Sequence, residues 1–327
     1  MELRQLGRTG LRVSRFGLGT LTWGRDTDEQ EAAEQLKAFV DAGGNLVDTA
    51  DVYADGGAEY LLSRLTDGLV PRAELVIASK AGSLPGTRRP DASRGHLLTA
   101  LDASLRRLGT DHVDLWQVHA YDPATPAEET LHALDLAVSS GRARYAGVCH
   151  YSGWQLAKAA AHQRVSPGSA PLASVQLEYS LLQRGIEREA LPAAVDAGVG
   201  LLACSPLGRG VLTGKYRHGV PPESRGASPH PHLAGSVQPY LGETSRRIVD
   251  ALATAADGLA STPLKVALAW VRDRPGVSAA LLGARTAAQL QSALSVEALT
   301  LPGEIRAALD DVSAPVHRYP DQGWTEL

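Results

Sequence analysis

The sequence predicts a (β/α)8 barrel of the α/β class, because short apolar segments alternate with longer helical patterns along its 327 residues. The apolar segments are bounded by Gly, Asp or Asn, and apolar residues in the helical ones recur with the 3.6-residue period of one helix face. In the segment 28–42, Ala32, Leu36 and Phe39 lie on such a face. Eight strands separated by helices suit a closed barrel, and we expect residues 1–327 to form a single domain.

Eight segments have the length and apolar content of buried strands. In chain order they are Ser14–Thr20, Asn45–Asp48, Leu75–Lys80, Val113–His119, Arg142–Cys149, Ala173–Glu178, Val199–Ser205 and Val277–Gly283. The helices expected between them are Asp28–Ala42, Ala58–Leu65, Ser93–Leu108, Ala127–Ser139, Trp154–Arg164, Ile186–Ala197 and Glu243–Ala260. The segment Leu3–Val13 precedes the first strand and carries two glycines around an expected turn, which predicts an N-terminal β-hairpin.

The segment Arg217–Leu241 follows the seventh expected strand and has neither a strand period nor a helix period. A loop of this length inside a compact domain is usually functional. In a barrel it would overhang the mouth, so we expect a long loop that serves as a lid, with a tolerated surface insertion as the alternative. Its His230 and His232 have no Cys or acidic cluster beside them, and we expect no metal site.

A doubly wound nucleotide-binding fold is the main structural alternative. That fold would normally carry a GxGxxG motif between its first strand and the next helix. Here Gly17 and Gly19 are present, but Thr22 stands where the third glycine would be. The missing glycine argues against this alternative.

The composition excludes several classes of partner. A net charge of −4 and an isoelectric point near 6.2 give no electrostatic reason to expect nucleic acid or a membrane surface. The N-terminus has no signal-peptide pattern. Two cysteines, Cys149 and Cys204, are too few for a disulfide framework. We therefore expect a cytoplasmic protein with no nucleic-acid or membrane partner.

Four chemically reactive side chains fall at or near neighbouring strand ends. Asp48, Lys80 and His119 close the second, third and fourth expected strands, and Tyr53 follows in the loop after Asp48. Barrel active sites lie at the carboxyl ends of the strands, and neighbouring strands are about 4.8 Å apart. These side chains can therefore meet, although each taken alone also has a structural explanation as a cap, a satisfied histidine or a packing residue.

Lys80 is the most informative of the four, because a buried ammonium is costly unless it is paired, and Asp48 is available as its partner. A free phenol has a pKa near 10, which a nearby ammonium lowers. We therefore expect Tyr53 to be a general acid activated by Lys80 and Asp48, with His119 orienting a carbonyl oxygen. No side chain can supply a hydride, so a reduction would require a cofactor.

The segment GNLVDTADVY at 44–53 resembles the signature of the aldo-keto reductase superfamily. The resemblance covers nearly the whole chain and includes VDLWQVH before residue 120, SVQLEYSLLQR at 174–184, SPLGRGVLTGKY at 205–216 and LLGARTAAQL near the C-terminus. The motifs are closest to the bacterial members and to the branch of potassium-channel β subunits. This resemblance implies an NADPH-dependent oxidoreductase that reduces aldehydes or ketones to alcohols, with a catalytic tetrad of Asp48, Tyr53, Lys80 and His119.

The same resemblance implies that NADPH lies across the barrel mouth. The residues implied to contact it are Thr20, Asp48, Cys149, His150, Gln176, Cys204, Ser205, Pro206, Leu207, Gly210, Lys215, Gly283, Arg285 and Gln289. Asp48 and Gln176 would hold the nicotinamide end, and the segment 205–207 would line the pyrophosphate. Arg285 would bind the adenosine 2′-phosphate, to which a guanidinium fork is suited; its alternative is a solvated residue at a helix start.

Three cofactor positions depart from the family pattern. Cys149 and His150 stand where Ser and Asn often occur, and Cys204 stands where many members place an aromatic residue. A thiol is a weaker hydrogen-bond donor than a hydroxyl, so we expect effects on cofactor affinity and hydride geometry. Buried cysteines acting as small apolar residues are the simpler interpretation, and a redox-sensitive cysteine pair is the alternative.

Two other functions stay open at this point. One is a Schiff-base aldolase that uses Lys80 as a nucleophile; the other is a binding or regulatory protein that keeps the NADPH pocket and has little catalysis. The sequence is compatible with a homo-oligomer without fixing one. Candidates for an aromatic lining of the substrate site, each with core packing as the alternative, are Trp23, Tyr121, Trp154 and Trp324.

Overall fold

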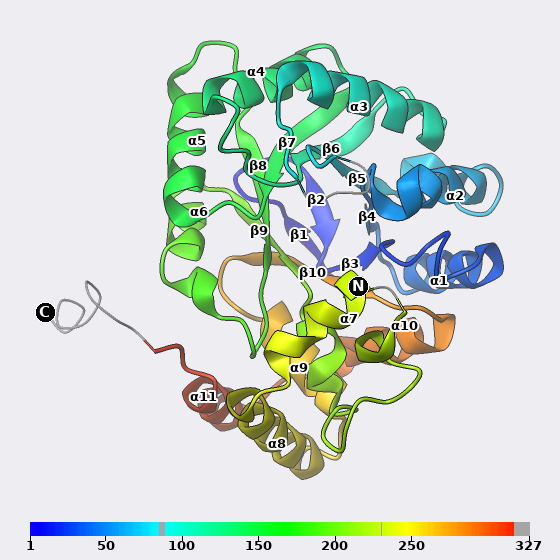
Figure 1. The fold of residues 1–327 in the computed structure, drawn as a ribbon, viewed down its shortest axis with the longest axis vertical. Helices are drawn as coiled ribbons and strands as arrows, with labels where there is room; N and C mark the ends of the chain where they lie inside the picture. Colours follow the sequence, from blue (N-terminus) through cyan, green and yellow to red (C-terminus); the bar gives the residue numbers. More distant parts are fainter. Residues whose placement is uncertain (85–88, 230, 317–327) are drawn as a thin grey trace, which may run out of the picture.

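Eight parallel strands close into a barrel in the order β10-β3-β4-β5-β6-β7-β8-β9 (Figure 1). The computed structural model describes residues 1–84, 89–229 and 231–316. The barrel strands are β3 Phe16–Gly19, β4 Leu46–Asp48, β5 Val76–Ala81, β6 Val113–Val118, β7 Ala143–Cys149, β8 Leu172–Glu178, β9 Gly200–Cys204 and β10 Val277–Gly283. The predicted (β/α)8 barrel is therefore confirmed, and each expected strand corresponds to one of these eight.

Helices surround the barrel on its outer side (Figure 1). Their bounds are α1 Glu29–Asp41, α2 Gly57–Thr66, α3 Arg94–Leu108, α4 Ala127–Ser139, α5 Gly153–Val165, α6 Ala190–Ala197, α8 Glu243–Gly258, α9 Pro263–Arg272, α10 Ala287–Leu294 and α11 Gly303–Val312. Polar side chains fix several starts: Asp28 accepts a hydrogen bond from the amide of Glu31 at α1, and Ser93 from that of His96 at α3.

The predicted N-terminal hairpin is present as β1 (Leu3–Gln5) paired antiparallel with β2 (Arg12–Ser14). Side chains from the hairpin pack against residues that point into the barrel from its strands, in one cluster that contains Leu6, Leu11, Val13, Leu46, Leu115 and Leu202. The hairpin therefore closes the end of the barrel opposite the strand carboxyl ends. The expected strand Ser14–Thr20 was too long, because Ser14 belongs to β2.

The segment 217–241 is more ordered than its sequence indicated. It contains two 3-10 turns, Arg225–Ala227 and Gln238–Tyr240, and between them the short helix α7 (Pro231–Val237). Our prediction of a long loop after the seventh strand is thus correct in position but wrong in excluding helix. A proline at the start of a short helix costs no hydrogen bond, which is why a proline-rich stretch can still contain α7.

The carboxyl ends of the barrel strands meet at one end, and the pairing register decides which residues are neighbours there. Asp48 lies opposite Ala78 between β4 and β5, and Lys80 lies opposite Gln117 between β5 and β6. Cys149 lies opposite Gln176, and Glu178 opposite Cys204, at the ends of β7, β8 and β9. The fold therefore collects most of the predicted site residues at one mouth.

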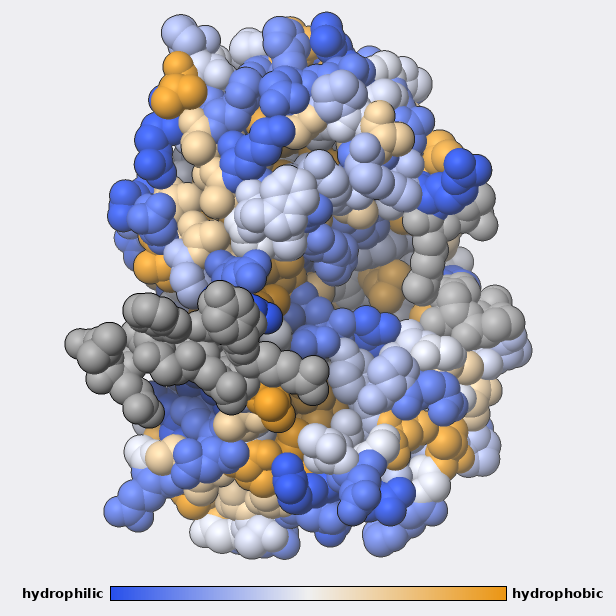
Figure 2. All heavy atoms as spheres, turned by 60° about the vertical axis from the view of Figure 1, so that its left-hand side comes forward, coloured by the Kyte–Doolittle hydropathy of each residue, from blue (hydrophilic) through white to orange (hydrophobic). Residues whose placement is uncertain are grey.

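The surface of the molecule is largely hydrophilic in the view of Figure 2, with scattered small apolar patches. Within the described residues, no helix is long and apolar enough to cross a membrane.

Candidate functional site

The centre of the mouth holds a buried ion pair. Lys80 Nζ lies 2.7 Å from Asp48 Oδ2 and donates a second hydrogen bond of 2.7 Å to the carbonyl of Thr49. The ammonium is fully buried and the carboxylate almost so. The other carboxylate oxygen, Asp48 Oδ1, accepts a hydrogen bond of 2.7 Å from Gln176 Nε2. Asp48 thus joins a predicted catalytic lysine to a predicted cofactor residue.

Tyr53 lies directly above this pair. Its ring, in the turn that follows β4, has its centroid 5.1 Å from Lys80 Nζ. The ring of His119, the residue after β6, lies 6.1 Å away from that of Tyr53 in an edge-on arrangement. The structure therefore brings all four predicted catalytic residues into one cluster.

Burial is the largest influence on the pKa values of the clustered side chains. It raises the pKa of Tyr53 to about 12, although Lys80 acts in the opposite direction. We expected the ammonium to lower this pKa toward neutral pH, and that expectation was wrong, because desolvation of the phenolate outweighs the attraction. The phenol therefore remains protonated at neutral pH, which a proton donor requires.

Burial alone would lower the pKa of Lys80, but the adjoining Asp48 carboxylate more than compensates and holds it above the ordinary lysine value. Burial and the Lys80 charge lower the pKa of His119 to about 3, so its imidazole is neutral. His119 Nδ1 is buried without a hydrogen-bond partner among the described residues. A neutral imidazole with an unused nitrogen can donate to or accept from a substrate, but it does not compete with Lys80 for the carboxylate.

The nicotinamide positions of the prediction lie around this cluster. Thr20 is buried after β3, and its amide donates to the carbonyl of Asp48 at 2.9 Å. His150 follows β7 with a left-handed backbone (φ 56°), and its ring stacks on that of His119 at 6.4 Å. Cys149 and Cys204 end their strands as free thiols, and burial raises the pKa of both. Protonated thiols of this kind are unreactive, which supports the apolar interpretation of the two cysteines.

A tight loop follows β9. Ser205 has a left-handed backbone (φ 51°), its carbonyl accepts from the amide of Gly208, and the carbonyl of Leu207 accepts from that of Gly210. Gly210 has φ 94°, and a Cβ placed on it would come within 3.2 Å of Lys215 Nζ. Pro206 is buried between these turns. The loop thus brings the predicted pyrophosphate residues and Lys215 together.

Three cations converge beyond this loop. Burial lowers the pKa of Lys215, and the charges of Arg285 and Arg225 lower it further. Arg285 follows Gly283 at the end of β10; its amide donates to Gln289 Oε1 at 3.0 Å, and its guanidinium donates to the carbonyl of Glu223. The three cations repel one another, and Asp26 is a carboxylate that acts on Arg225 from nearby.

Arg225 was missed by the sequence reasoning. It lies in the 3-10 turn Arg225–Ala227 of the segment 217–241, and burial lowers its pKa. No local pattern distinguished it from the other arginines. Only the fold brings it to Lys215 and Arg285, which are distant from one another in sequence.

The segment 217–241 is fastened to the mouth by three residues, Glu178, Arg209 and Tyr240, which we call the loop clasp. Arg209 Nη2 lies 2.6 Å from Glu178 Oε2, and the hydroxyl of Tyr240 donates to Glu178 Oε1 at 2.8 Å. Arg209 also donates to the carbonyl of Ser236 at 3.3 Å. The clasp joins the end of β8, the loop after β9 and the end of the long segment.

The residues predicted as an aromatic lining of the substrate site lie in different environments in the structure. Trp23 is fully buried and donates to Gln35 Oε1 at 3.1 Å, so it is a core residue and not part of a lining. Tyr121 and Trp154 lie at the mouth, where their rings contact each other. Trp324 lies outside the described residues, as does His230. Among the described residues, no group of three or more His, Cys, Asp or Glu is placed to hold a metal ion.

Comparison with known proteins agrees with this geometry. The model of the aldo/keto reductase family matches residues 15–314. The chain is 35% identical over 323 residues to a putative voltage-gated potassium channel subunit beta of Schizosaccharomyces pombe, covering 95% of this chain and 93% of that protein. It is also 35% identical to the uncharacterized oxidoreductase YrpG of Bacillus subtilis, covering 95% and 96%. The L-glyceraldehyde 3-phosphate reductase of Escherichia coli is 35% identical as well, covering 91% and 88%. The chain therefore belongs to the aldo/keto reductase family and is an oxidoreductase of that type.

Proposed function

We propose that this protein reduces aldehydes or ketones to alcohols with NADPH. The observation that carries the proposal is the buried Lys80–Asp48 pair set beneath the Tyr53 ring. A buried ion pair is an expensive feature that stability alone does not favour. Its position at the strand carboxyl ends, under a protonated phenol, is explained if the phenol is a proton donor.

The residues of the cluster take distinct parts in the proposed reaction. Tyr53 donates its proton to the carbonyl oxygen as negative charge develops there, because an alkoxide is far more basic than a phenolate. Lys80 lies close enough to stabilise the phenolate that remains, and Asp48 keeps the ammonium in place. His119, with its neutral ring facing Tyr53, orients the carbonyl oxygen.

The residues present fit NADPH as the cofactor, which would supply the hydride when bound. The cation group of Lys215, Arg225 and Arg285 suits the phosphates of the cofactor, and a 2′-phosphate in particular. Gln176 and Thr20 would hold the nicotinamide end beside Asp48. The remaining contacts would come from Cys149, His150, Cys204, Ser205, Pro206, Leu207, Gly210, Gly283 and Gln289.

The segment 217–241 is, in this proposal, the lid over the bound cofactor. The loop clasp holds one end of the segment, and the bond from Arg285 to the carbonyl of Glu223 ties it to the end of β10. A cofactor that lay beneath would be released only when these contacts open. The lid therefore controls cofactor release more than it controls access of a small substrate.

The alternative of a Schiff-base aldolase fits the site poorly. A nucleophilic lysine must lose its proton, whereas Lys80 is paired with Asp48 and its pKa is raised. We further propose that the protein acts in the cytoplasm on a small carbonyl compound, without a nucleic-acid or membrane partner, and that any assembly is a homo-oligomer. The two free thiols support a reducing compartment.

NADPH oxidation followed at 340 nm with a panel of aldehydes tests the proposal. We expect turnover with NADPH and much weaker turnover with NADH. A protein that binds NADPH tightly, as measured by fluorescence titration, and oxidises none of it with any aldehyde would contradict the proposal. That result would favour the binding or regulatory alternative.

A further inference from the structure

The turn that carries Tyr53 has an unfavourable backbone. Tyr53 begins the 3-10 turn Tyr53–Gly56, in which Ala54 has φ 50° and Asp55 has φ 54°. A left-handed backbone is unfavourable for a residue with a Cβ, and such a conformation persists only where the surrounding structure enforces it. The position of the Tyr53 ring therefore depends on contacts from outside the turn.

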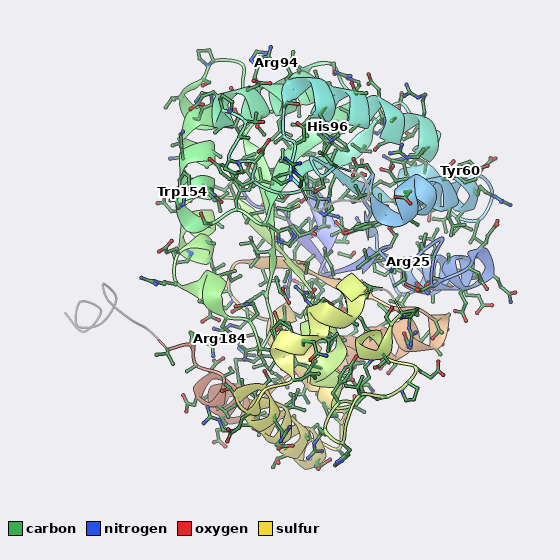
Figure 3. The ribbon with its side chains drawn as sticks, viewed as in Figure 1. Arg25, Tyr60, Arg94, His96, Trp154 and Arg184 are labelled. Atoms are coloured by element: carbon green, nitrogen blue, oxygen red, sulfur yellow. The ribbon has the colours of Figure 1, made fainter. Side chains whose placement is uncertain are left out.

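Glu59 lies in the helix that follows this turn. It is the third residue of α2 and is fully buried. Tyr60, the next residue, is 59% exposed at the outside of the molecule (Figure 3). Helix α2 therefore directs the Glu59 side chain inward, six residues after Tyr53. A buried carboxylate is costly unless it is paired, and the two oxygens of Glu59 have separate partners.

One oxygen of Glu59 is bound to the strand that carries Lys80. The hydroxyl of Ser79 on β5 donates to Glu59 Oε1 at 2.5 Å. Ser79 immediately precedes Lys80, and successive side chains of a strand point to opposite faces. Ser79 therefore points outward to α2 while Lys80 points into the mouth. Glu59 thus ties α2 to the residue next to the buried ammonium.

The other oxygen of Glu59 is bound to α3, which lies beside α2 (Figure 1). Arg107 on α3 donates from Nε to Glu59 Oε2 at 2.8 Å, and its Nη2 lies 2.7 Å from the same oxygen. Arg107 also lies against the Tyr53 turn, since a Cβ added to Gly56 would come within 2.6 Å of Arg107 Cδ. One arginine therefore contacts the end of the turn and holds the Glu59 carboxylate.

The chain before Tyr53 is joined to the same strand. The amide of Asp51 donates to the carbonyl of Lys80 on β5 at 3.0 Å. Burial and the charge of Glu59 raise the pKa of the Asp51 carboxyl, and the charge of Arg107 lowers it. The segment 51–59 is therefore tied to β5 at both ends, through the Asp51 amide and through Glu59, with Tyr53 between them.

We propose that Glu59 is a positioning residue, which fixes Tyr53 at the distance from Lys80 that proton donation requires. The inference rests on the proposed carbonyl reduction and on the present separation of 5.1 Å between Lys80 Nζ and the ring centroid of Tyr53. Glu59 acts through the turn, from outside the mouth. Displacing a reacting group by about 1 Å can cost about 100-fold in rate, so a carboxylate behind the site can control kcat.

The test begins with Glu59→Gln. An amide has one acceptor oxygen where the carboxylate uses two, so it cannot serve both Ser79 and Arg107. The Arg107 side chain is 29% exposed and can turn to water, so we expect the variant to fold. We expect kcat with 4-nitrobenzaldehyde to fall about tenfold, while KM for the aldehyde and Kd for NADPH stay within twofold. Ser79→Ala, which removes one hydrogen bond, should lower kcat about two- to fivefold.

A double-variant comparison separates positioning from general damage. In a Tyr53→Phe background, Glu59→Gln should change the residual kcat less than twofold, because the residue through which it acts is gone. The matched control is Asp114→Asn. Asp114 Oδ2 likewise accepts from an arginine, Arg72 Nη2 at 2.7 Å, and from β5, the amide of Ile77 at 2.8 Å, but near the amino ends of the strands. This control should keep the wild-type kcat.

Three results would overturn the inference. One is an unchanged kcat in Glu59→Gln; another is the same fold-loss in the presence and absence of the Tyr53 hydroxyl. The third is an equal loss of kcat in Asp114→Asn, which would indicate damage to the barrel as a whole. Should Glu59→Gln fail to fold, Ser79→Ala takes its place in the same comparisons.

Failure of the proposed function can be told apart from failure of this inference by NMR of protein labelled with 13Cζ-tyrosine. The Tyr53 signal is identified by its loss in Tyr53→Phe. We expect this signal to shift in Glu59→Gln more than those of the other tyrosines, and to stay in place in Asp114→Asn. A shifted Tyr53 signal in a protein that reduces no aldehyde would support the positioning role and contradict only the reductase. Aldehyde reduction with an unshifted signal and an unchanged kcat in Glu59→Gln would contradict only the positioning role.

Discussion

Lys80 and Asp48 form an ion pair of 2.7 Å between neighbouring barrel strands, and both side chains are removed from water. The pair is held on both sides, because Lys80 also donates to the carbonyl of Thr49 and Asp48 also accepts from Gln176. Neither charge has an alternative partner of opposite sign in direct contact among the described residues. The stability of the mouth and the proposed chemistry therefore depend on the same two residues.

Removal of Asp48 alone should be strongly destabilising. Asp48→Ala leaves the Lys80 ammonium buried without its carboxylate, and we expect a loss of about 3–5 kcal/mol in the free energy of unfolding. Urea denaturation measures this. The double variant Asp48→Ala with Lys80→Met removes both charges and should recover most of the loss. A double variant as unstable as the single one would show that the unpaired charge is not the cause.

Asp51 should make the protein less stable as the pH rises. Burial and the nearby Glu59 raise its pKa to about 7, and its Oδ1 is buried without a partner among the described residues. A raised folded-state pKa stabilises the fold below the unfolded value near 3.8, and this stabilisation is lost as the pH rises from about 4 to 7.

Asp51→Asn should therefore be about 1–2 kcal/mol more stable than the wild type at pH 8 and nearly equal to it at pH 4. Urea denaturation at both pH values gives the comparison. Asp67→Asn, at an exposed carboxyl after α2, serves as the control. A gain that is the same at both pH values would mean that the carboxylate charge is not responsible.

Arg225 and Arg285 should determine the preference of the protein for NADPH over NADH. Both guanidinium charges act on Lys215, and in the proposed function each would form a charge-assisted hydrogen bond to a phosphate of the cofactor. We expect Arg225→Ala and Arg285→Ala each to raise the Kd for NADPH about tenfold or more, while the Kd for NADH changes little. Fluorescence titration with both cofactors measures this, with NADH as the internal control. Equal weakening of both would mean that the arginines do not contact the 2′-phosphate.

The loop clasp should slow the departure of the cofactor. Tyr240→Phe removes the hydrogen bond from its hydroxyl to Glu178 and leaves the Arg209–Glu178 pair in place. We expect NADPH to dissociate a few-fold faster, as measured by stopped-flow fluorescence. The control is Tyr145→Phe, near the amino end of β7, where the ring packs against the cluster beneath the N-terminal hairpin, at the other end of the barrel from the clasp. An unchanged rate of NADPH dissociation in Tyr240→Phe would show that the loop clasp does not control release of the cofactor.

Much of the fold and of the candidate catalytic cluster could be predicted from the sequence, because barrel strands are short apolar runs and their last residues share one end. Asp48, Lys80 and His119 follow directly from that rule. Helix α9 was not expected, although Thr262 accepts from the amide of Lys265 and Pro263 starts the helix, both of which are local signals.

The electrostatics could not be predicted in the same way. The pKa of Tyr53 depends on how fully the fold desolvates it, and a sequence does not give that quantity. Arg225 reaches Lys215 and Arg285 only through the folding of the segment 217–241. The raised pKa of Asp51 likewise depends on its distance to Glu59 across the loop.

The most direct test of the central claim is the turnover of Tyr53→Phe, measured as NADPH oxidation at 340 nm with 4-nitrobenzaldehyde. We expect kcat to fall about 10²- to 10⁴-fold, the usual contribution of a general acid, while the Kd for NADPH stays within twofold of the wild type. Tyr60→Phe, at an exposed position on α2, should retain activity. A Tyr53→Phe protein that binds NADPH normally and retains its kcat would contradict the account, because the proton would then come from elsewhere.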